Sequence, residues 1–438
     1  MDTAGTVVER DAVVIGAGIS GLVTAKCLKE DGYDVIMLER SSDVGGLWTF
    51  REHDYGVMKF THINVSKYNY CFSDYPFPDS TPDYPHHTDM ARYVKDYATH
   101  FRLLELVQFN VKVVSVEQTG EKWRITACKV KDDGKAGEET DVKIVFVCSY
   151  LAVTSGHHAK PSYPKFPGED TFPGECCRLL WGLNPKMGAL QTQPTVSPTL
   201  IHHIQRRNVK IVPNITRIEG RTVHFVNGYS AEFDKILYCT GYKIDLPFLP
   251  ESVKSHVLQE GSNYIKLYKN VFAPHVGSSL AFIGFVQPAS GGILTMAETQ
   301  ARWFSALCKG KVRLPSAPEM ELDIKTEKKE AESRWYQSAR HTIQKDPILY
   351  CDEVAAMIGA KPDPLKNPLL AWRLLFSTCG AAQYRLTGPH SWSGAREQVL
   401  RVPVTDMWRY SSYLLIAFLL FALYYVLSTV CGIFCAFS

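Results

Sequence analysis

The sequence lacks any strong bias of charge or cysteine content. Its 438 residues carry 48 Lys and Arg against 45 Asp and Glu, a net charge of +3, which is too small to favour nucleic acid as the main partner. Twelve cysteines are too few and too irregular for the disulfide scaffold of a small secreted protein. With 45% hydrophobic and 21% charged residues, the composition is that of a folded protein of about two or three domains.

Signals for metal binding and secretion are also missing. Neighbouring histidines occur at 86–87, 157–158 and 202–203, but adjacent positions on a strand or helix do not face one ion, so we expect no metal. Residues 1–10 include Asp2, Glu9 and Arg10 and contain no apolar run, so no secretory signal peptide is predicted. Together with thiols that we expect to be reduced, this predicts a body facing the cytosol.

The C-terminal end departs from this balanced composition. No charged residue follows Arg409, and residues 413–434 are mostly Leu, Ile, Phe, Val, Ala and Tyr. About 20 apolar residues are enough to span a bilayer, so the pattern predicts a transmembrane helix. A buried core helix is the alternative, although a core helix of this length usually has a polar edge. Arg401 and Arg409 place the near side in the cytosol, which makes residues 408–438 a predicted tail anchor.

The clearest positive signal lies near the N-terminus. Residues 12–15 are a short apolar run, residues 16–21 have the pattern G-x-G-x-x-G, residues 22–30 predict a helix, and residues 34–38 are a second apolar run that ends at Glu39. This complete strand–helix–strand pattern is far more specific than an isolated glycine motif. It predicts a dinucleotide-binding fold.

Each glycine of this pattern has a separate physical role. Gly16 permits the tight turn, Gly18 lets a pyrophosphate approach the backbone, and Gly21 lets the helix pack on the strand. Glu39 is placed to bind a ribose 2′-hydroxyl and repels a 2′-phosphate, so NADP is disfavoured at this site. The predicted dinucleotide contacts are Gly16, Ala17, Gly18, Ile19, Ser20, Gly21 and Glu39.

The residues after Glu39 connect the chain with a known family. Gly45, Gly46, Leu47 and Trp48 form a segment similar to the G-G-x-W segment of the flavin-containing monooxygenases of the microsomal dimethylaniline N-oxide-forming type. The likeness continues through residues 61–67 and 71–78, 155–164, 238–242 and 384–389. The resemblance implies that FAD is the dinucleotide and that residues 45–48 contact it.

The resemblance also implies roles for three further residues. In the family, the asparagine that matches Asn64 lies at the flavin ring and helps to position NADP. Asn64 is therefore the candidate catalytic residue, Asn64 and Val65 are candidate flavin contacts, and Ile63 and Asn64 are candidate NADP contacts.

The middle of the chain predicts further elements. Alternating runs over 111–147 around a polar turn predict antiparallel strands inserted into the flavin domain. Residues 233–237 and 281–288 predict strands. Glu298 is expected to begin a helix whose N-terminal dipole faces the flavin ring.

One block of the family pattern is missing. The family's identifying motif is F-x-G-x-x-x-H-x-x-x-(Y/F), but Arg178 stands at the histidine position and Gly182 at the aromatic position. No second G-x-G-x-x-G occurs. On the order of a hundred residues are absent between Cys177 and Trp181, about the size of a mononucleotide-binding half-domain.

The predicted fold is α/β: an FAD/NAD(P)-binding, doubly wound Rossmann-like fold with an antiparallel β insertion and a C-terminal transmembrane helix. The expected divisions are a first part of the FAD-binding domain at 1–175, a remnant of the NADP-binding domain at 176–230, a second FAD-binding part at 231–330, a helical region at 331–407 and the tail at 408–438.

Two functional hypotheses follow. The first is an FAD-dependent, NADPH-using monooxygenase that oxygenates soft nitrogen or sulfur nucleophiles of small molecules with O₂ at the endoplasmic reticulum membrane, its catalytic body in the cytosol. The alternative is a catalytically impaired FAD-binding form that acts as an uncoupled oxidase or a non-catalytic interaction partner. The missing block favours the alternative and makes NADPH binding doubtful. Homo-oligomerisation is left open, and no nucleic acid is expected.

Overall fold

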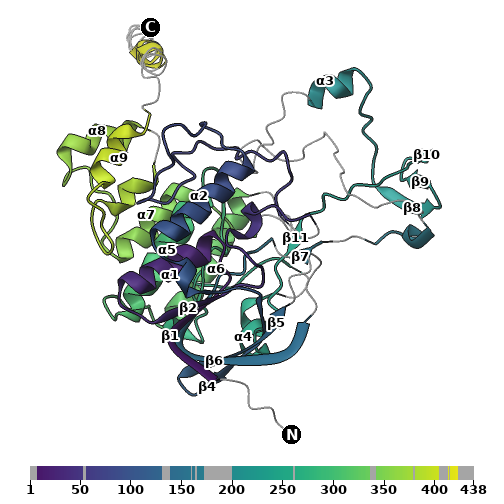
Figure 1. Ribbon diagram of the computed structural model, residues 1–438. Helices are drawn as coiled ribbons and strands as arrows, with labels where there is room; N and C mark the ends of the chain where they lie inside the picture. Colours follow the sequence, from purple (N-terminus) through teal and green to yellow (C-terminus); the bar gives the residue numbers. More distant parts are fainter. Residues whose placement is uncertain are drawn as a thin grey trace, which may run out of the picture.

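The computed structural model of the protein describes residues 7–52, 56–130, 139–158, 160–162, 165–171, 200–259, 262–335, 342–377, 380–403, 413 and 415–422. Figure 1 shows a body built on one sheet, with helices packed against it, and a small sheet that stands apart from this body. The helices are α1 (Ile19–Glu30), α2 (His87–His100), α3 (Leu200–Gln205), α4 (Glu251–Val257), α5 (Ile293–Cys308), α6 (Ala317–Arg334), α7 (Pro347–Met357), α8 (Pro368–Phe376) and α9 (Ala395–Arg401).

The main sheet is mixed. Its order is β3-β2-β1-β6-β5-β4, with β12 also paired to β6. The pairs of β1 with β2 and β6, of β2 with β3, and of β12 with β6 are parallel, whereas β4, β5 and β6 pair antiparallel. The strands of this sheet are β1 (Val7–Ile15), β2 (Val35–Leu38), β3 (Val107–Gln108), β4 (Val111–Thr119), β5 (Lys122–Val130), β6 (Glu139–Val153) and β12 (Leu280–Phe282).

The remaining strands form smaller sheets. The sheet that stands apart from the body has the order β10-β9-β8, and two further sheets are the pairs β11-β7 and β13-β14. These strands are β7 (Lys160–Pro161), β8 (Ile215–Glu219), β9 (Thr222–Phe225), β10 (Ser230–Glu232), β11 (Tyr242–Lys243), β13 (Gln287–Pro288) and β14 (Gln344–Lys345).

Side chains that alternate along β1 supply two separate cores. Ala12 and Val14 belong to the core that includes α1 and α5, whereas Val13 and Ile15 belong to the core that includes α4. Since successive strand residues point to opposite faces, a strand with buried side chains on both faces must read as a continuous apolar run. This explains why residues 12–15 stand out in the sequence.

The antiparallel strands predicted over 111–147 are confirmed as β4, β5 and the first part of β6. The strand predicted at 233–237 is wrong, because β10 ends at Glu232 and no strand follows it there. Phe233 is 38% exposed and Leu237 47% exposed. Phe233 and Leu237 therefore lie partly at the surface, whereas Ile236 packs against the small core of the β10-β9-β8 sheet.

Two predicted regions fall partly outside the described residues. Of the expected NADP-domain remnant at 176–230, the structure describes 200–230, which holds α3 and the β10-β9-β8 sheet; Arg178 and Gly182 lie in the part it does not describe. Of the expected tail at 408–438 it describes Tyr413 and residues 415–422. Within the described chain, no helix combines the length and the apolar character needed to span a bilayer.

Candidate functional site

The first glycine turn connects β1 with α1. Gly16 has φ +104°, a left-handed conformation that favours glycine. Its N–H donates to the Leu38 carbonyl at 2.9 Å, and the Thr154 hydroxyl donates to the carbonyls of Ile15 and Gly16 at 2.8 and 3.0 Å. The ends of β1, β2 and β6 are thus tied together at one edge of the sheet.

The helix that follows presents an open N-terminus. Gly18 is the N-cap of α1, no side chain caps it, and its first turn holds no acidic residue. A Cβ at Gly21 would lie 1.9 Å from the Gly16 carbonyl oxygen, so only glycine allows α1 to pack this closely on the turn. Uncapped N–H groups and the helix dipole favour an anion such as a pyrophosphate here.

Glu39 lies beside this turn at the end of β2. Its Oε2 accepts a hydrogen bond from the Ala17 N–H at 2.8 Å, and its Oε1 accepts from the N–H and the hydroxyl of Ser41 at 2.9 and 2.7 Å. Each carboxylate oxygen can accept two hydrogen bonds. The carboxylate is therefore held in place and keeps acceptor capacity for a ribose hydroxyl.

A second glycine turn meets the first. Gly45 and Gly46 have φ +108° and +57°, and the Gly45 N–H donates to the Ala17 carbonyl at 3.0 Å. A Cβ at Gly46 would lie 3.2 Å from the Gly18 Cα. The two turns thus face each other with bare backbone, which is the surface that a dinucleotide phosphate group requires.

Arg51 is a residue that the sequence pattern did not single out. Its guanidinium donates to the Gly46 carbonyl at 3.2 Å and to the Ser41 hydroxyl at 2.9 Å. It brings a positive charge to the second glycine turn, where it would complement a pyrophosphate. No spacing rule in the sequence connects Arg51 with the fingerprint, so only the fold could show this contact.

Leu47 and Trp48 continue the second turn in a short 3₁₀ segment, Gly46–Trp48. The Leu47 carbonyl accepts from the Val57 N–H at 3.0 Å. The Trp48 ring packs edge-on against Tyr70 with 5.6 Å between ring centroids. This contact links the glycine turn with the segment that follows Asn64.

The structure places the predicted residues around Asn64 in different environments. Ile63 is 3% exposed, and its N–H donates to the Pro85 carbonyl at 3.0 Å. Val65 is half-buried. Asn64 is exposed, and its side chain makes no hydrogen bond to the part of the chain that the structure describes. The proposed contacts of these residues with flavin and NADP therefore stay predictions.

His157 lies four residues after the end of β6 and contacts the loop at Gly284. Its Nδ1 lies 3.1 Å from the carbonyl of Gly284, and because a carbonyl only accepts, Nδ1 carries the proton. A Cβ at Gly284 would lie 2.2 Å from the Ser20 hydroxyl oxygen in the first turn of α1. Burial, reinforced by neighbouring His158, lowers the pKa of His157 to about 3, so the ring is neutral at pH 7.

The neutral state of His157 predicts a pH dependence of stability. In the unfolded chain a histidine has a pKa of about 6.5, so between pH 6.5 and 3 the unfolded state binds a proton that the folded state does not. Stability should therefore fall as the pH drops through this window, by at most about 1.4 kcal/mol per pH unit for this group. Chemical denaturation of His157→Gln should show a shallower slope.

His203→Gln, at an exposed position, is the matched control and should keep the wild-type slope. Burial also lowers the pKa of His390, to about 4. The dependence of stability on pH that His390 causes should therefore persist in His157→Gln. Equal slopes for wild type and His157→Gln would show that this ring is charged in the folded protein.

The helix expected to begin at Glu298 begins five positions earlier, so that expectation is wrong. Helix α5 runs over Ile293–Cys308 with Gly292 as its N-cap, and Glu298 is 2% exposed in its interior. Its carboxylate accepts from the N–H and the hydroxyl of Ser73 at 2.9 and 2.7 Å and pairs with the Arg385 guanidinium. Glu298 is thus a structural group and not a helix start.

Arg385 is the centre of this buried charge network. It also donates to the Ser73 hydroxyl at 2.6 Å and lies 3.1 Å from Asp74, which in turn lies 2.7 Å from Lys26 of α1. Burial alone would raise the pKa of Asp74, but Arg385 and Lys26 outweigh burial and lower it. The network connects α1, the segment around Ser73, α5 and the C-terminal region.

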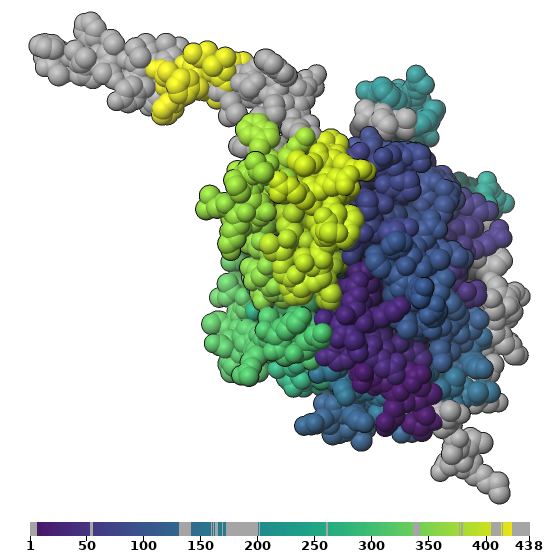
Figure 2. Space-filling view, turned by 60° about the vertical axis from the view of Figure 1, so that its left-hand side comes forward, coloured from purple at the N-terminus to yellow at the C-terminus, as the bar shows by residue number. Residues whose placement is uncertain are grey.

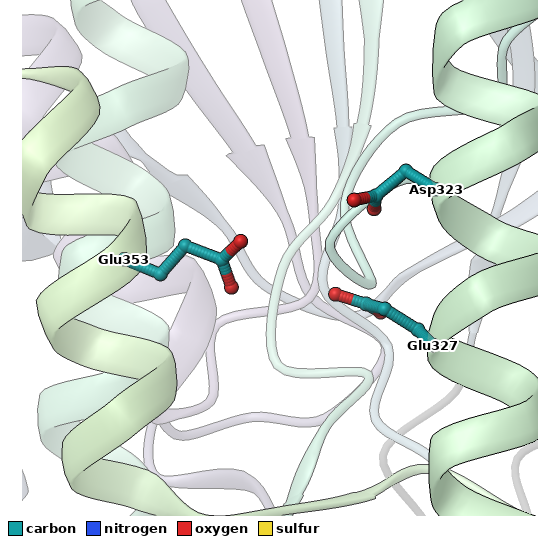
Figure 3. A group of neighbouring side chains, drawn as sticks. All are labelled: Asp323, Glu327 and Glu353. Carbon is teal, nitrogen blue, oxygen red and sulfur yellow. The ribbon is translucent and has the colours of Figure 1, made fainter.

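A group of three carboxylates resembles a metal site but holds a lysine. Figure 3 shows Asp323 and Glu327 of α6 facing Glu353 of α7. The Nζ of Lys269 lies 2.9, 2.7 and 2.6 Å from their oxygens. The ammonium occupies the position that a cation would take, so these carboxylates serve to join α6 and α7 to the segment at Lys269.

Removal of this ammonium should be costly. The Lys269 side chain is 4% exposed, and Lys269→Met leaves Asp323 and Glu353 without this cation, while Glu327 keeps Lys345 at 2.5 Å. We expect a loss of about 3–5 kcal/mol in the free energy of unfolding, the usual cost of breaking a buried ion pair. Lys122→Met, at an exposed lysine paired with Glu9, is the control and should change stability by less than about 1 kcal/mol in denaturant titrations. If the two substitutions lowered the free energy of unfolding equally, the structural role of Lys269 would be refuted.

Comparison with known proteins decides the family. The sequence model described as "Flavin-binding monooxygenase-like" matches residues 9–180 and 177–408. The chain belongs to this family. The two matched segments overlap at residues 177–180. This is the place where the sequence lacks a block of the family pattern, between Cys177 and Trp181.

The curated relatives of this flavin-binding monooxygenase-like protein are named flavin-containing monooxygenases. It is 31% identical to flavin-containing monooxygenase 5 of Rattus norvegicus over 499 positions, which cover 88% of this chain and 90% of the relative. It is 30% identical to flavin-containing monooxygenase 3 of Homo sapiens over 502 positions, covering 89% and 91%. Both alignments are longer than the 438 residues of the chain, so the relatives hold positions that this protein lacks.

Solved structures share the fold. S-allyl-L-cysteine S-oxygenase from Allium sativum superposes with a TM-score of 0.63 at 23% identity, covering 90% of this chain and 99% of that one. Tmm from a Pelagibacter strain gives 0.60 at 20% identity, covering 79% and 86%. The protein is thus an enzyme of the flavin-containing monooxygenase family with an α/β fold, and membership implies the use of FAD and NADPH.

Proposed function

We propose that this protein binds FAD between its two glycine turns and oxygenates soft nitrogen or sulfur nucleophiles of small molecules. The observation that carries the proposal is the meeting of the bare backbones of Gly18 and Gly46 beside the fixed carboxylate of Glu39. When bound, the flavin supplies the oxygen chemistry, so the protein needs no nucleophile or acid–base pair of its own.

The residues at the site would each perform a binding task. The free N–H groups at the start of α1 and the Arg51 guanidinium hold the pyrophosphate, and Glu39 accepts a hydrogen bond from the ribose. His157 holds the Gly284 carbonyl and so fixes the loop that lies against the first turn of α1. Asn64 remains the candidate residue at the flavin ring and at the nicotinamide.

A second candidate function follows from the junction at 177–180. Alignments longer than the chain and a single G-x-G-x-x-G support a protein that holds FAD but is reduced poorly by NADPH. Such a form would act as an uncoupled oxidase or as a non-catalytic partner of related proteins. The two candidates share the FAD site and differ in what happens after the flavin is reduced.

The test separates these candidates. The full chain is purified in detergent, and its visible spectrum is recorded for bound flavin. The flavin is then reduced with dithionite and aerated with a thioether present; a thioether is the first choice because the garlic protein is named an S-oxygenase of S-allyl-L-cysteine. Sulfoxide supports the monooxygenase, hydrogen peroxide without sulfoxide supports the oxidase, and a colourless protein refutes both FAD-dependent functions.

We also propose that the protein is attached to the endoplasmic reticulum membrane by its C-terminal tail. The location follows from the family resemblance and the insertion from the apolar sequence. In support, the described part of the tail is a helix that exposes its apolar side chains, among them Phe418 at 68% and Phe421 at 67%. Helix α8 at the same end of the body (Figure 1) exposes Leu369 at 80% and Trp372 at 53%. Apolar surface of this extent is unfavourable in water.

Truncation of the tail tests this attachment. A chain that ends at Pro403 should move from the membrane pellet to the supernatant after carbonate washing, because about 20 apolar residues provide most of the affinity for a bilayer. The full chain should stay in the pellet. A truncated chain that resists carbonate extraction would refute anchoring by the tail.

A further inference from the structure

A cavity lies where the segment of residues 67–79 meets the end of α9. Its volume is about 250 Å³, just below the roughly 300–1,000 Å³ of pockets for drug-sized ligands, so only a small group would fit. Its lining combines two cationic side chains, one carboxylate, one amide and apolar walls. The lining residues are Lys67, Tyr68, Cys71, Pro76, Phe77, Asp79, Gln398 and Arg401.

Lys67 differs from the other two buried lysines of the described chain in its partners. Lys26 pairs with two carboxylates and Lys269 with three. Lys67 is 7% exposed, yet its Nζ has only two hydrogen bonds, to the backbone carbonyls of Asp79 at 3.2 Å and Thr81 at 2.5 Å. An ammonium has three donors, so this one keeps a donor for the cavity that it lines, and its charge faces the Tyr68 ring at 5.6 Å from the centroid instead of a carboxylate. A buried charge of this kind calls for an anion.

The mouth of the cavity adds charges of both signs. Arg401 is 54% exposed and is held by an exposed i,i+4 pair with Glu397 at 2.7 Å, which costs little to exchange for another anion. Asp79 is exposed in a turn of the lining segment. A zwitterion with a phosphate and an ammonium would satisfy both signs, whereas a simple anion would face the Asp79 carboxylate.

The position of the cavity points to a lipid as the source. Arg401 ends α9, two residues before the described body ends at Pro403, and the proposed membrane tail follows. Gly380 lies between Val402 and the Tyr68 carbonyl, so the cavity segment packs near the residues that follow α9 at the end of the described body. Figure 2 shows the yellow C-terminal part of the body directly against the blue N-terminal half.

We infer that this cavity binds the head group of a zwitterionic phospholipid. The phosphate lies between Lys67 and Arg401, the ammonium lies at Asp79, and the rings of Tyr68 and Phe77 form the wall. The choice of a lipid over a free phosphate rests on the proposed membrane attachment. The inference that the cavity takes a group with both a phosphate and an ammonium rests only on the positions of Lys67, Arg401 and Asp79 and is independent of that attachment. The site is separate from the glycine turns.

The test measures lipid binding to the full chain in an uncharged detergent by native mass spectrometry. The probes are dihexanoyl-phosphatidylethanolamine, dihexanoyl-phosphatidylglycerol and inorganic phosphate. We expect the ethanolamine lipid to bind best, and Lys67→Met and Arg401→Gln each to weaken it by about tenfold or more, because each removes a charge-assisted hydrogen bond. Asp79→Asn should weaken the ethanolamine lipid and leave the glycerol lipid unchanged or tighter. Lys122→Met is the control and should bind as the wild type does.

Three outcomes would overturn the inference. They are equal binding by wild type and both cation variants, no preference for the ethanolamine lipid over the glycerol lipid, and inorganic phosphate that binds as tightly as the lipid. Arg401 and Asp79 are exposed, so their variants keep the test valid if Lys67→Met does not fold. Carbonate extraction tests the tail separately, so failure of the lipid site and failure of the membrane attachment are distinguishable.

Discussion

Millimolar NADPH should reduce the bound FAD of this protein very slowly. A nicotinamide dinucleotide phosphate needs a glycine turn, the helix N-terminus behind it and a positive group for its 2′-phosphate. The sequence contains one G-x-G-x-x-G, and Glu39 in that site repels a 2′-phosphate. Each missing charge-assisted hydrogen bond removes about 1.5–3 kcal/mol. The loss of several should weaken NADPH binding by several orders of magnitude.

The measurement is anaerobic mixing of the FAD-loaded full chain with NADPH, followed by the flavin absorbance. Dithionite is the control, because it needs no nucleotide pocket and should bleach the flavin completely. Aeration of the dithionite-reduced protein with a thioether present then separates the two candidate functions: sulfoxide is expected of the monooxygenase, and hydrogen peroxide in excess over sulfoxide is expected of the uncoupled oxidase. Rapid bleaching by NADPH, with sulfoxide formed in step with NADPH consumed, would show that another part of the chain or a partner supplies the pocket.

Gly18→Val and Gly21→Val should have different effects although both alter the fingerprint. A Cβ at Gly18 meets nothing closer than the Gly46 Cα at 3.7 Å, an ordinary contact, so the fold should survive. The valine methyl groups then occupy the gap between the two turns. Loss of two or more phosphate hydrogen bonds at about 1.5–3 kcal/mol each predicts FAD affinity lower by at least about 100-fold.

Gly21→Val should damage the fold itself, because its Cβ would lie 1.9 Å from the Gly16 carbonyl oxygen. We expect a lower melting temperature as well as loss of flavin. Both variants are compared by thermal denaturation and by flavin absorbance per protein. Gly120→Asn is the control, since Gly120 has φ +62° and open space around it, and Asn tolerates this conformation. Full flavin absorbance in Gly18→Val would show that the site is wrongly assigned.

The sequence predicted the elements that local chemistry determines. The strand, glycine turn, helix and second strand of the fingerprint are confirmed as β1, α1 and β2, because apolar runs and glycines act over a few residues. The antiparallel strands are confirmed for the same reason. The early start of α5 at Ile293 was missed because its N-cap, Gly292, offers no capping side chain.

Contacts between segments that are distant in the sequence could not be predicted from it. Arg51 and His157 reach the candidate site only because the sheet brings the ends of β1, β2 and β6 to one edge. Glu298 was mistaken for a helix start because its partners Ser73 and Arg385 lie 225 and 87 positions away. No local sequence pattern predicts a hydrogen-bond or ion-pair partner at that separation.

The pairing of Arg385 with Ser73, 312 positions earlier in the chain, has a consequence for biosynthesis. Glu298 is made 87 positions before the Arg385 guanidinium that pairs with it, and until then Asp74 has Lys26 as its cation. At roughly 5–20 residues per second, the ribosome needs about a quarter of a minute to a minute to travel from one partner to the other. During that interval the hydrogen bonds around Ser73 lack the Arg385 guanidinium, so we expect this part of the buried network to form only after the C-terminal segment emerges.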